Sequence, residues 1–252
     1  MTFRSLLLST LASLLFVAFG TKASASQHAV IETSYGPIVV ELDEDKAPIS
    51  VANFEAYAEN GFYTNTVFHR VIPGFMIQGG GFDHHGNYPA GLHNKSAHQT
   101  MLPPIVNEWK NGLKNVRGSI AMARLGGKVD SATSQFFINL KDNGFLDQPR
   151  DGAAYAVFGK VIAGMDVVDR IAAVPTGNFA GMGDVPAQEV TIRAVRILPL
   201  DEAMSLAAQA EIKAAEARVE SARDAVSDSQ AELESAIRDL EELKKKAAAG
   251  GE

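Results

Sequence analysis

Between Asp201 and Ala249 the chain contains neither proline nor glycine, the two residues least compatible with a helix interior. Asp201 can cap a first turn, and two sets of side chains, three residues apart, each recur every seven residues as in a coiled-coil seam. Such a helix extends on the order of 60 Å, too far for a closing turn of the domain before it. We therefore expect a domain over residues 26–200 and a helical heptad extension over residues 201–252. The first seam set is Ile212, Val219, Val226, Leu233 and Leu240, and the second is Ala215, Ala222, Ser229, Ala236 and Leu243.

Two interpretations of this heptad extension are open. One is a helix exposed to water on all sides, because alanine and serine in the second seam set bury little apolar area. The other is association, since a strictly kept seven-residue apolar repeat serves no purpose on a helix surrounded by water. We expect residues 206–246 to form a homodimer or to bind a protein partner. The pairs that support the helix locally are Glu234 with Arg238, Glu241 with Lys245 and Glu242 with Lys246.

The preceding domain has the pattern of many short strands and two helices. Helices are expected over Ile49–Asn60, which Gly61 ends, and over Gly164–Ala173. Residues 82–104 are polar and rich in glycine and proline, which predicts a long loop. Because few helices accompany many strands, a closed β-barrel is favoured over βαβ units. The expected strands are residues 28–42 (a hairpin), 66–72, 75–78, 119–123, 135–140, 154–161 and 190–198.

The first 25 residues have the pattern of a secretory signal peptide. Arg4 supplies positive charge, an apolar run extends over Leu6–Phe19, and Ala23-Ser24-Ala25 fits a small-residue cleavage site. The run is shorter than the roughly 20 apolar residues that span a bilayer, so a retained signal anchor is the weaker alternative. We expect residues 1–25 to be removed and the mature protein, beginning near Ser26, to reside in the periplasm.

Composition excludes several classes of function. The absence of cysteine rules out disulfides, a thiolate nucleophile and a cysteine-ligated metal. The formal net charge is -7, and residues 201–252 hold 13 acidic and 7 basic side chains, which leaves 17 and 16 for residues 1–200. A nearly neutral domain without a basic stripe argues against nucleic acid and against an anionic membrane surface as partners.

The sequence motifs of the domain indicate its family more specifically than the spacing of its apolar residues does. The segment Phe68–Gly80, FHRVIPGFMIQGG, resembles the signature of the cyclophilins, a family of peptidyl-prolyl cis-trans isomerases. Three further blocks match in the family's order, at residues 119–124, at residues 134–139, and at residues 145–147 followed by 155–161. The resemblance covers residues 28–198, is closest to bacterial periplasmic cyclophilins and stops before the heptad extension. It implies a mainly β fold, an eight-stranded antiparallel barrel capped by two α-helices, to which the long C-terminal helix is added.

The resemblance also implies roles for residues in the matching blocks. Arg70 corresponds to the catalytic arginine, and Gln78 and Gln135 correspond to polar groups that orient the substrate backbone. Singly, Arg70 would fit a surface ion pair and the apolar residues would fit barrel core, but their joint order and spacing favour the family's site. The residues matching the proline pocket are Phe75, Met76, Phe137 and Leu146. Further substrate contacts are expected from His69, Ala123, Arg124, Phe145 and Tyr155.

The implied function is acceleration of cis-trans rotation about Xaa-Pro bonds in folding or flexible polypeptides. No cofactor and no metal are expected, because rotation changes no covalent bond. The alternative function is an envelope chaperone or scaffold that uses the heptad extension to dimerise or to bind a partner.

Three positions depart from the family's pattern. Phe145 stands where many eukaryotic members have tryptophan, so an indole N–H donor is missing and weak binding of the inhibitor cyclosporin is expected. Tyr155 stands where bacterial relatives carry histidine. Arg124 replaces an asparagine whose backbone contacts substrate, so contacts at Ala123 and Arg124 are expected from the backbone.

The stretch 82–104 contains four of the six histidines, namely His84, His85, His93 and His98. Imidazole suits zinc and copper. However, no helix or strand spacing groups these side chains, so a solvated loop is favoured over a metal site.

Overall fold

The computed structural model describes residues 27–97, 99–179 and 181–249, and the expected signal peptide lies outside them. Among the described residues the helices are α1 (Pro48–Glu59), α2 (Met165–Ala172) and α3 (Leu200–Ala249), with the 3-10 turns η1 (Lys95–Ala97) and η2 (Gly144–Asp147). The strands are β1 (His28–Thr33), β2 (Gly36–Leu42), β3 (Thr66–Val67), β4 (Arg70–Ile72), β5 (Met76–Gly79), β6 (Phe82–His84), β7 (Leu92–Asn94), β8 (Ser119–Met122), β9 (Phe136–Asn139), β10 (Val157–Ala163), β11 (Thr176–Phe179), β12 (Met182–Pro186) and β13 (Thr191–Leu198).

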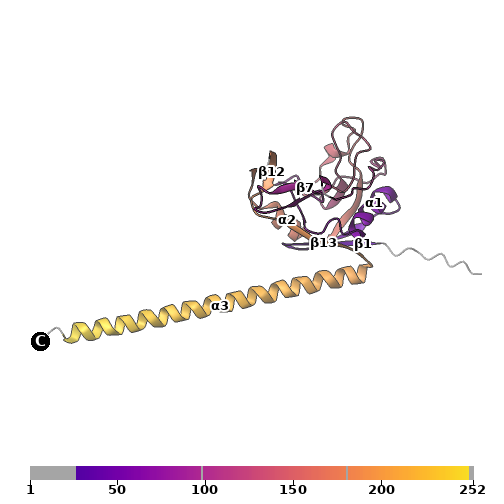
Figure 1. Cartoon of the computed structure of the whole chain (residues 1–252). Helices are drawn as coiled ribbons and strands as arrows, with labels where there is room; N and C mark the ends of the chain where they lie inside the picture. Colours follow the sequence, from indigo (N-terminus) through magenta and orange to yellow (C-terminus); the bar gives the residue numbers. More distant parts are fainter. Residues whose placement is uncertain (1–26, 98, 180, 250–252) are drawn as a thin grey trace, which may run out of the picture.

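One curled antiparallel sheet forms the body of the domain (Figure 1). Among the described residues it has eleven strands, in the order β4-β5-β9-β8-β10-β2-β1-β13-β3-β6-β7. Together with the two short helices and α3, this confirms the expected mainly β fold, although the strands are divided more finely than the expected eight. Residues 66–72, for example, form β3, which pairs with β13, and then β4, which pairs with β5. Because this short segment joins distant places in the strand order, the sheet must curl back on itself.

Two hairpins differ from the expectation drawn from the sequence. The segment 82–104, expected to be one long loop, contains β6 and β7 as well as η1, and β6 extends the sheet by pairing Phe82 with Val67 of β3. After α2, β11 and β12 form a separate two-stranded hairpin. Neither hairpin has a clear alternation of apolar and polar residues, because its strands are short and lie at the periphery.

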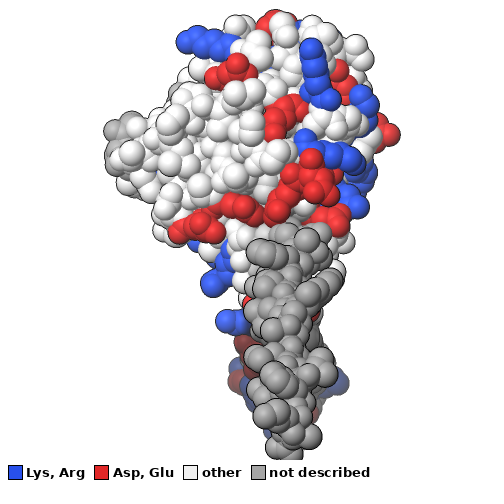
Figure 2. All heavy atoms as spheres, turned by 90° about the vertical axis from the view of Figure 1, so that its right-hand side faces the viewer, with Lys and Arg blue, Asp and Glu red and all other residues white. Residues whose placement is uncertain are grey.

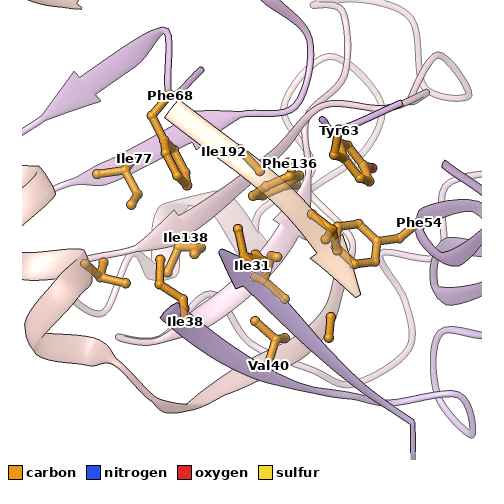
Figure 3. Close-up of a cluster of buried hydrophobic side chains, with 14 of the residues drawn as sticks. Ile31, Ile38, Val40, Phe54, Tyr63, Phe68, Ile77, Phe136, Ile138 and Ile192 are labelled. Carbon is orange, nitrogen blue, oxygen red and sulfur yellow. The ribbon is translucent and has the colours of Figure 1, made fainter. Parts of the chain in front are cut away.

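The hydrophobic core fills the space inside the curl (Figure 3). Val71, Ile77, Ile138 and Ile120 lie directly opposite one another across β4, β5, β9 and β8, and all are fully buried. On α1, the ring of Phe54 lies 5.2 to 5.6 Å from the rings of Tyr63, Phe136 and Phe158. This aromatic cluster packs α1 against the inner face of the sheet.

The helix α3 packs on the domain through its first turns. Ala203 and Ala207 are buried against Val30 of β1 and Val39 of β2, whereas all residues in the range 211–246 are exposed. Figure 1 shows the rest of the helix projecting away from the domain, and charged side chains of this projecting part are visible in Figure 2. In the described part of the chain, no helix carries a stretch apolar enough to cross a membrane. Two of the expected ion pairs are confirmed, Glu234 with Arg238 at 3.9 Å and Glu242 with Lys246 at 2.7 Å.

Candidate functional site

A row of side chains crosses the sheet on the face opposite the core. Arg70 on β4 lies opposite Gln78 on β5, which lies opposite Phe137 on β9. The row continues to Ala121 on β8 and Val157 on β10. Directly opposed residues share one face of a sheet, and these alternate along their strands with the core residues. Arg70 and Phe137 are therefore two strands apart on one face, a separation of roughly 10 Å at about 4.8 Å per strand.

The apolar members of this row belong to a group that we call the outer cluster. Phe137 packs edge-on against Tyr155 with ring centroids 5.6 Å apart, and Phe75 stacks on Phe145 at 5.5 Å. Phe137 is 5% exposed and Phe145 41%, so the cluster has a buried floor and a solvent-facing rim. Such a surface can hold a small apolar ring. The buried members are Met76, Ala121, Phe137, Leu146 and Val157, and the partly buried ones are Ile72, Phe75, Leu113, Ala123 and Tyr155.

Polar groups border the outer cluster on the side of Arg70. Gln78 Nε2 donates to Gln135 Oε1 at 2.8 Å, which fixes both amides beside Phe137. Arg70 Nε donates to Asp184 Oδ2 on β12 at 3.3 Å. That bond uses Nε and leaves the two terminal nitrogens of the guanidinium for other acceptors. The site thus combines a cationic donor, two oriented amides and an apolar floor on one sheet face.

Comparison with known proteins identifies the domain. Residues 28–197 match the family described as cyclophilin type peptidyl-prolyl cis-trans isomerase/CLD. The chain belongs to this family. Its enzymatic activity is accordingly peptidyl-prolyl cis-trans isomerisation, as the resemblance of its motifs implies.

Relatives of this cyclophilin include bacterial enzymes. It is 50% identical over 181 residues to a peptidyl-prolyl cis-trans isomerase of Acinetobacter baylyi, covering 72% of this chain and 90% of that one. It is 48% identical over 168 residues to peptidyl-prolyl cis-trans isomerase B of Escherichia coli, covering 66% and 96%. A solved cyclophilin-type isomerase of Cryptosporidium parvum is 29% identical with a TM-score of 0.54, covering 69% of this chain and 98% of that one, and was also solved in the presence of the dipeptide Ala-Pro. None of these matches extends over the whole of this chain.

A chain of asparagines lies beside the floor of the cyclophilin site, with Asn139 opposite Met76 on the same sheet face. Asn143 Nδ2 donates to the carbonyl oxygen of Phe75 at 2.9 Å and to Asn139 Oδ1 at 2.8 Å. Asn139 Nδ2 in turn donates to Asn115 Oδ1 at 3.1 Å, and Asn115 Nδ2 to Asp147 Oδ1 at 2.8 Å. These bonds tie β9 to η2, the turn that carries Phe145 and Leu146, so they fix the rim relative to the floor.

The side chain of Arg124 has a structural role. Its guanidinium lies 4.9 Å from the ring centroid of Tyr155 and donates through Nη2 to the carbonyl oxygen of Arg150 at 3.0 Å. It therefore clamps the loop before Tyr155 and orients that ring against Phe137. Ala123 lies beside it, with its N–H donating to the carbonyl oxygen of Gln135 at 2.9 Å.

His69 is set apart from the other expected contacts. Its side chain is buried, and its ring lies 4.4 Å from that of Phe82 rather than in the outer cluster. Burial, together with the neighbouring charge of Arg70, lowers the pKa of His69 to about 4. The ring is therefore neutral near pH 7, and its visible function is packing beside Arg70.

Acidification is expected to destabilise the fold through His69. The unfolded chain takes up a proton on this residue near pH 6.5, whereas the folded chain does so near pH 4. The stability that the neutral ring contributes is thus fully present above about pH 6.5 and is lost as the pH falls toward 4. For one proton the slope is at most about 1.4 kcal/mol per pH unit. Urea unfolding from pH 7 to 4.5 measures it, and His69→Phe should flatten that slope. An unaltered slope in the variant would assign the acid sensitivity to other groups.

Among the described residues no group of three or more histidine, cysteine, aspartate or glutamate side chains is placed to hold a metal ion. His84 Nε2 lies 2.9 Å from Glu189 Oε2, which ties β6 to the segment before β13. The rings of His85 and His93 lie 5.4 Å apart across the β6–β7 hairpin. His98 lies outside the described residues.

Some residues of the site were not predicted from the sequence. Ala121 and Val157 complete the floor of the outer cluster, and strict alternation within their expected strands could have placed them there. Asp184 comes from the β11–β12 hairpin, and no local pattern points to its contact with Arg70, which is 114 positions away in the chain.

Proposed function

We propose that this isomerase acts by donating a hydrogen bond from Arg70 to the prolyl nitrogen while the outer cluster holds the proline ring. Rotation breaks amide resonance against a barrier of about 18–20 kcal/mol, and the uncatalysed exchange takes roughly tens to hundreds of seconds. In the planar amide the nitrogen lone pair is delocalised. In the twisted amide the lone pair is localised and can accept a hydrogen bond, so a donor placed there binds the transition state better than the substrate.

The observation that carries this proposal is the shared sheet face of Arg70 and the outer cluster. The guanidinium is charged at all physiological pH values and presents its N–H groups in a rigid fork. A charged hydrogen bond contributes about 1.5–3 kcal/mol, or roughly one to two orders of magnitude in rate. Binding of the ring supplies the remainder, because Phe75, Met76, Phe137 and Leu146 hold one side of the bond while the other side rotates.

Other residues of the site would orient the substrate backbone. Gln78 and Gln135 offer amide groups beside the floor, and Ala123 and Arg124 offer backbone groups on its far side. His69 has no acid–base role in this mechanism, because no proton is transferred. The Ala-Pro dipeptide present with the Cryptosporidium parvum relative supports proline-containing polypeptides as substrates. The pattern of residues 1–25 supports a periplasmic site of action.

The test compares the mature chain, residues 26–252, with a version ending at Glu211. This shorter version keeps Ala203 and Ala207, which cover Val30 and Val39. Both proteins should accelerate isomerisation of a short Xaa-Pro peptide equally. A mature chain that leaves the uncatalysed rate unchanged would overturn the proposal.

A second function, as an envelope chaperone that dimerises through α3, is favoured by the exposure of the first seam set. Ile212 is 59% and Leu233 62% exposed, which leaves a continuous apolar seam uncovered. The mature chain should therefore sediment as a dimer and suppress aggregation of an unfolded client. The version ending at Glu211 should sediment as a monomer and lose that suppression while its peptide activity stays the same. A mature chain that remains monomeric at high concentration contradicts this second function.

Cyclosporin is expected to bind weakly because Phe145, on the rim, offers no N–H donor. Phe145→Trp keeps the stacking on Phe75 and adds the donor, so affinity should rise roughly three- to tenfold, the effect of about one hydrogen bond. Calorimetric titration of both proteins measures this. Phe145→Leu is the matched control. Equal cyclosporin affinities for the tryptophan and leucine variants would show that the missing N–H donor does not account for the weak binding.

A further inference from the structure

Where α3 leaves the domain, the apolar seam is on the side of the helix that faces away from the domain. Successive residues of an α-helix are about 100° apart around its axis. Ile212 therefore lies about 180° from Ala203 and about 140° from Ala207, the two residues buried on the sheet. The projection of α3 in Figure 1 leaves the seam accessible along its length. A second helix can therefore pack there without meeting the domain.

A parallel, in-register pair of α3 helices would have seam layers of unequal size and contacts between side chains of the same charge. In that arrangement each seam residue packs against the same residue of the second copy. Layers of two isoleucines, valines or leucines then alternate with layers of two alanines or serines, and a layer of two leucines at Leu243 ends the series. The residues that flank the seam are those one before and four after each member of the first set. In the parallel pair Glu211 faces Glu216 of the second copy and Arg218 faces Arg223 of the second copy, and both contacts are repulsive.

An antiparallel pair reduces the inequality of the layers and removes the contacts between like charges. One register places every member of the first seam set against a member of the second, so Val219 meets Ala236, Val226 meets Ser229 and Leu240 meets Ala215 of the other copy. A large residue then faces a small one in four of the five kinds of layer, which pack at even spacing, and Ile212 against Leu243 is the one layer of two large residues. The same register brings Glu211 against Lys246 and Arg218 against Asp239 of the second copy. No flanking pair joins like charges.

The lysines near the end of one helix lie beside an acidic side chain of the other in this register. Lys244, Lys245 and Lys246 of one copy lie level with residues 209–211 of the other, about two turns past Asp201 and Glu202, so their acidic neighbour is Glu211.

We propose that two copies of α3 pair antiparallel in this register, which rests on the dimer proposed above. The partner recognised by the seam is a second copy of this chain. The two domains then sit at opposite ends of the paired helices, about 60 Å apart between their Ala207 anchors. Both outer clusters stay accessible, and one unfolded client can be engaged at two separated sites.

Single cysteines test the orientation, because the chain has none of its own. In the antiparallel register Ala215→Cys faces Leu240→Cys of the other copy, whereas two copies of either variant have their thiols roughly 38 Å apart. A disulfide needs α-carbons within about 7 Å. Oxidation of a mixture of the two mature variants should therefore give a heterodimer, and oxidation of either alone should give none. Ala217→Cys, on the side of the helix away from the seam, is the control for random collision.

The outcomes separate the orientation from the dimer itself. Cross-linking of Ala215→Cys alone would show a parallel pair and overturn the orientation while the dimer stands. A dimeric molar mass with no cross-link in the mixture would overturn the register. A monomeric molar mass for the uncross-linked chain would overturn the dimer and the orientation together.

Charge reversal supplies a second test, because the two orientations predict opposite changes in the dimer dissociation constant. Glu211→Lys places like charges against Lys246 in the antiparallel pair, so the dimer dissociation constant should rise roughly tenfold. In a parallel pair the same change would relieve the repulsion with Glu216 and lower that constant. Glu211→Lys combined with Lys246→Glu should restore the original value. Sedimentation equilibrium measures all three proteins, and tighter association of the single variant would refute the antiparallel arrangement.

Discussion

Replacing Phe136 with alanine is expected to lower the free energy of unfolding by about 3–5 kcal/mol. The side chain is fully buried, and its ring lies 5.6 Å from Phe54, 5.7 Å from Tyr63 and 6.1 Å from Phe68, each in an edge-on arrangement. Truncation removes those contacts and leaves a cavity between α1 and the sheet. Denaturant unfolding monitored by circular dichroism measures the loss, and thermal unfolding should shift by roughly 10 °C.

The adjacent residue Phe137 is the matched control, because it has the same side chain and points to the opposite face of β9. Phe137→Ala should chiefly weaken peptide binding, raising KM in the isomerase assay under conditions where the protein is fully folded. Phe136→Ala, assayed at a temperature where it too is folded, should keep a KM close to that of the unmodified protein. A reversal of these two behaviours would contradict the assignment of the core and the outer cluster to opposite faces.

Replacing Arg70 with glutamine is expected to lower kcat/KM for an Xaa-Pro peptide by roughly 10- to 100-fold. Glutamine keeps N–H donors of similar reach but carries no charge, so the variant removes the charge-assisted part of the hydrogen bond. Stability should change by less than about 1 kcal/mol, because the ion pair with Asp184 joins side chains that are 43% and 44% exposed. The measurement is the initial rate of catalysed isomerisation at low peptide concentration, with unfolding curves for both proteins.

Asp184→Asn is the control for this prediction. It removes the charge that pairs with Arg70 Nε but leaves the guanidinium in place, so kcat/KM should fall by about threefold or less. A loss as large as that of Arg70→Gln would mean that the ion pair, rather than a bond to the substrate, accounts for the importance of the arginine. If neither variant lowered kcat/KM, binding of the proline ring by the outer cluster would remain as the source of the rate acceleration.

Much of the fold could be predicted because its elements have strong local signals. The hairpin of β1 and β2 has alternating apolar residues around a glycine turn. The helix α1 begins at a proline and ends two residues before a glycine, and α3 contains neither proline nor glycine. The small β6–β7 and β11–β12 hairpins could not be predicted, since strands of three to five residues at the periphery show no clear periodicity.

The candidate site could be located through its motifs, but its geometry could not. The motif between Phe68 and Gly80 points to Arg70, Phe75, Met76 and Gln78, and the later blocks point to Phe137 and Leu146. That Arg70, Gln78 and Phe137 form one row depends on the pairing of β5 with both β4 and β9, and the choice of strand neighbours is a property of the whole sheet. The burial of His69 against Phe82 and the pairing of Arg70 with Asp184 depend on peripheral hairpins for the same reason.

The central claim is that Arg70 stabilises the twisted amide beside a bound proline ring. Exchange spectroscopy by NMR on an Xaa-Pro peptide at cis-trans equilibrium tests it most directly, because no net reaction occurs and the exchange rate at saturating peptide reports rotation in the bound state. We expect Arg70→Gln to bind the peptide with an affinity within about threefold of the unmodified protein while its catalysed exchange slows by roughly tenfold or more. An exchange rate in the variant equal to that of the unmodified protein would contradict the proposed mechanism.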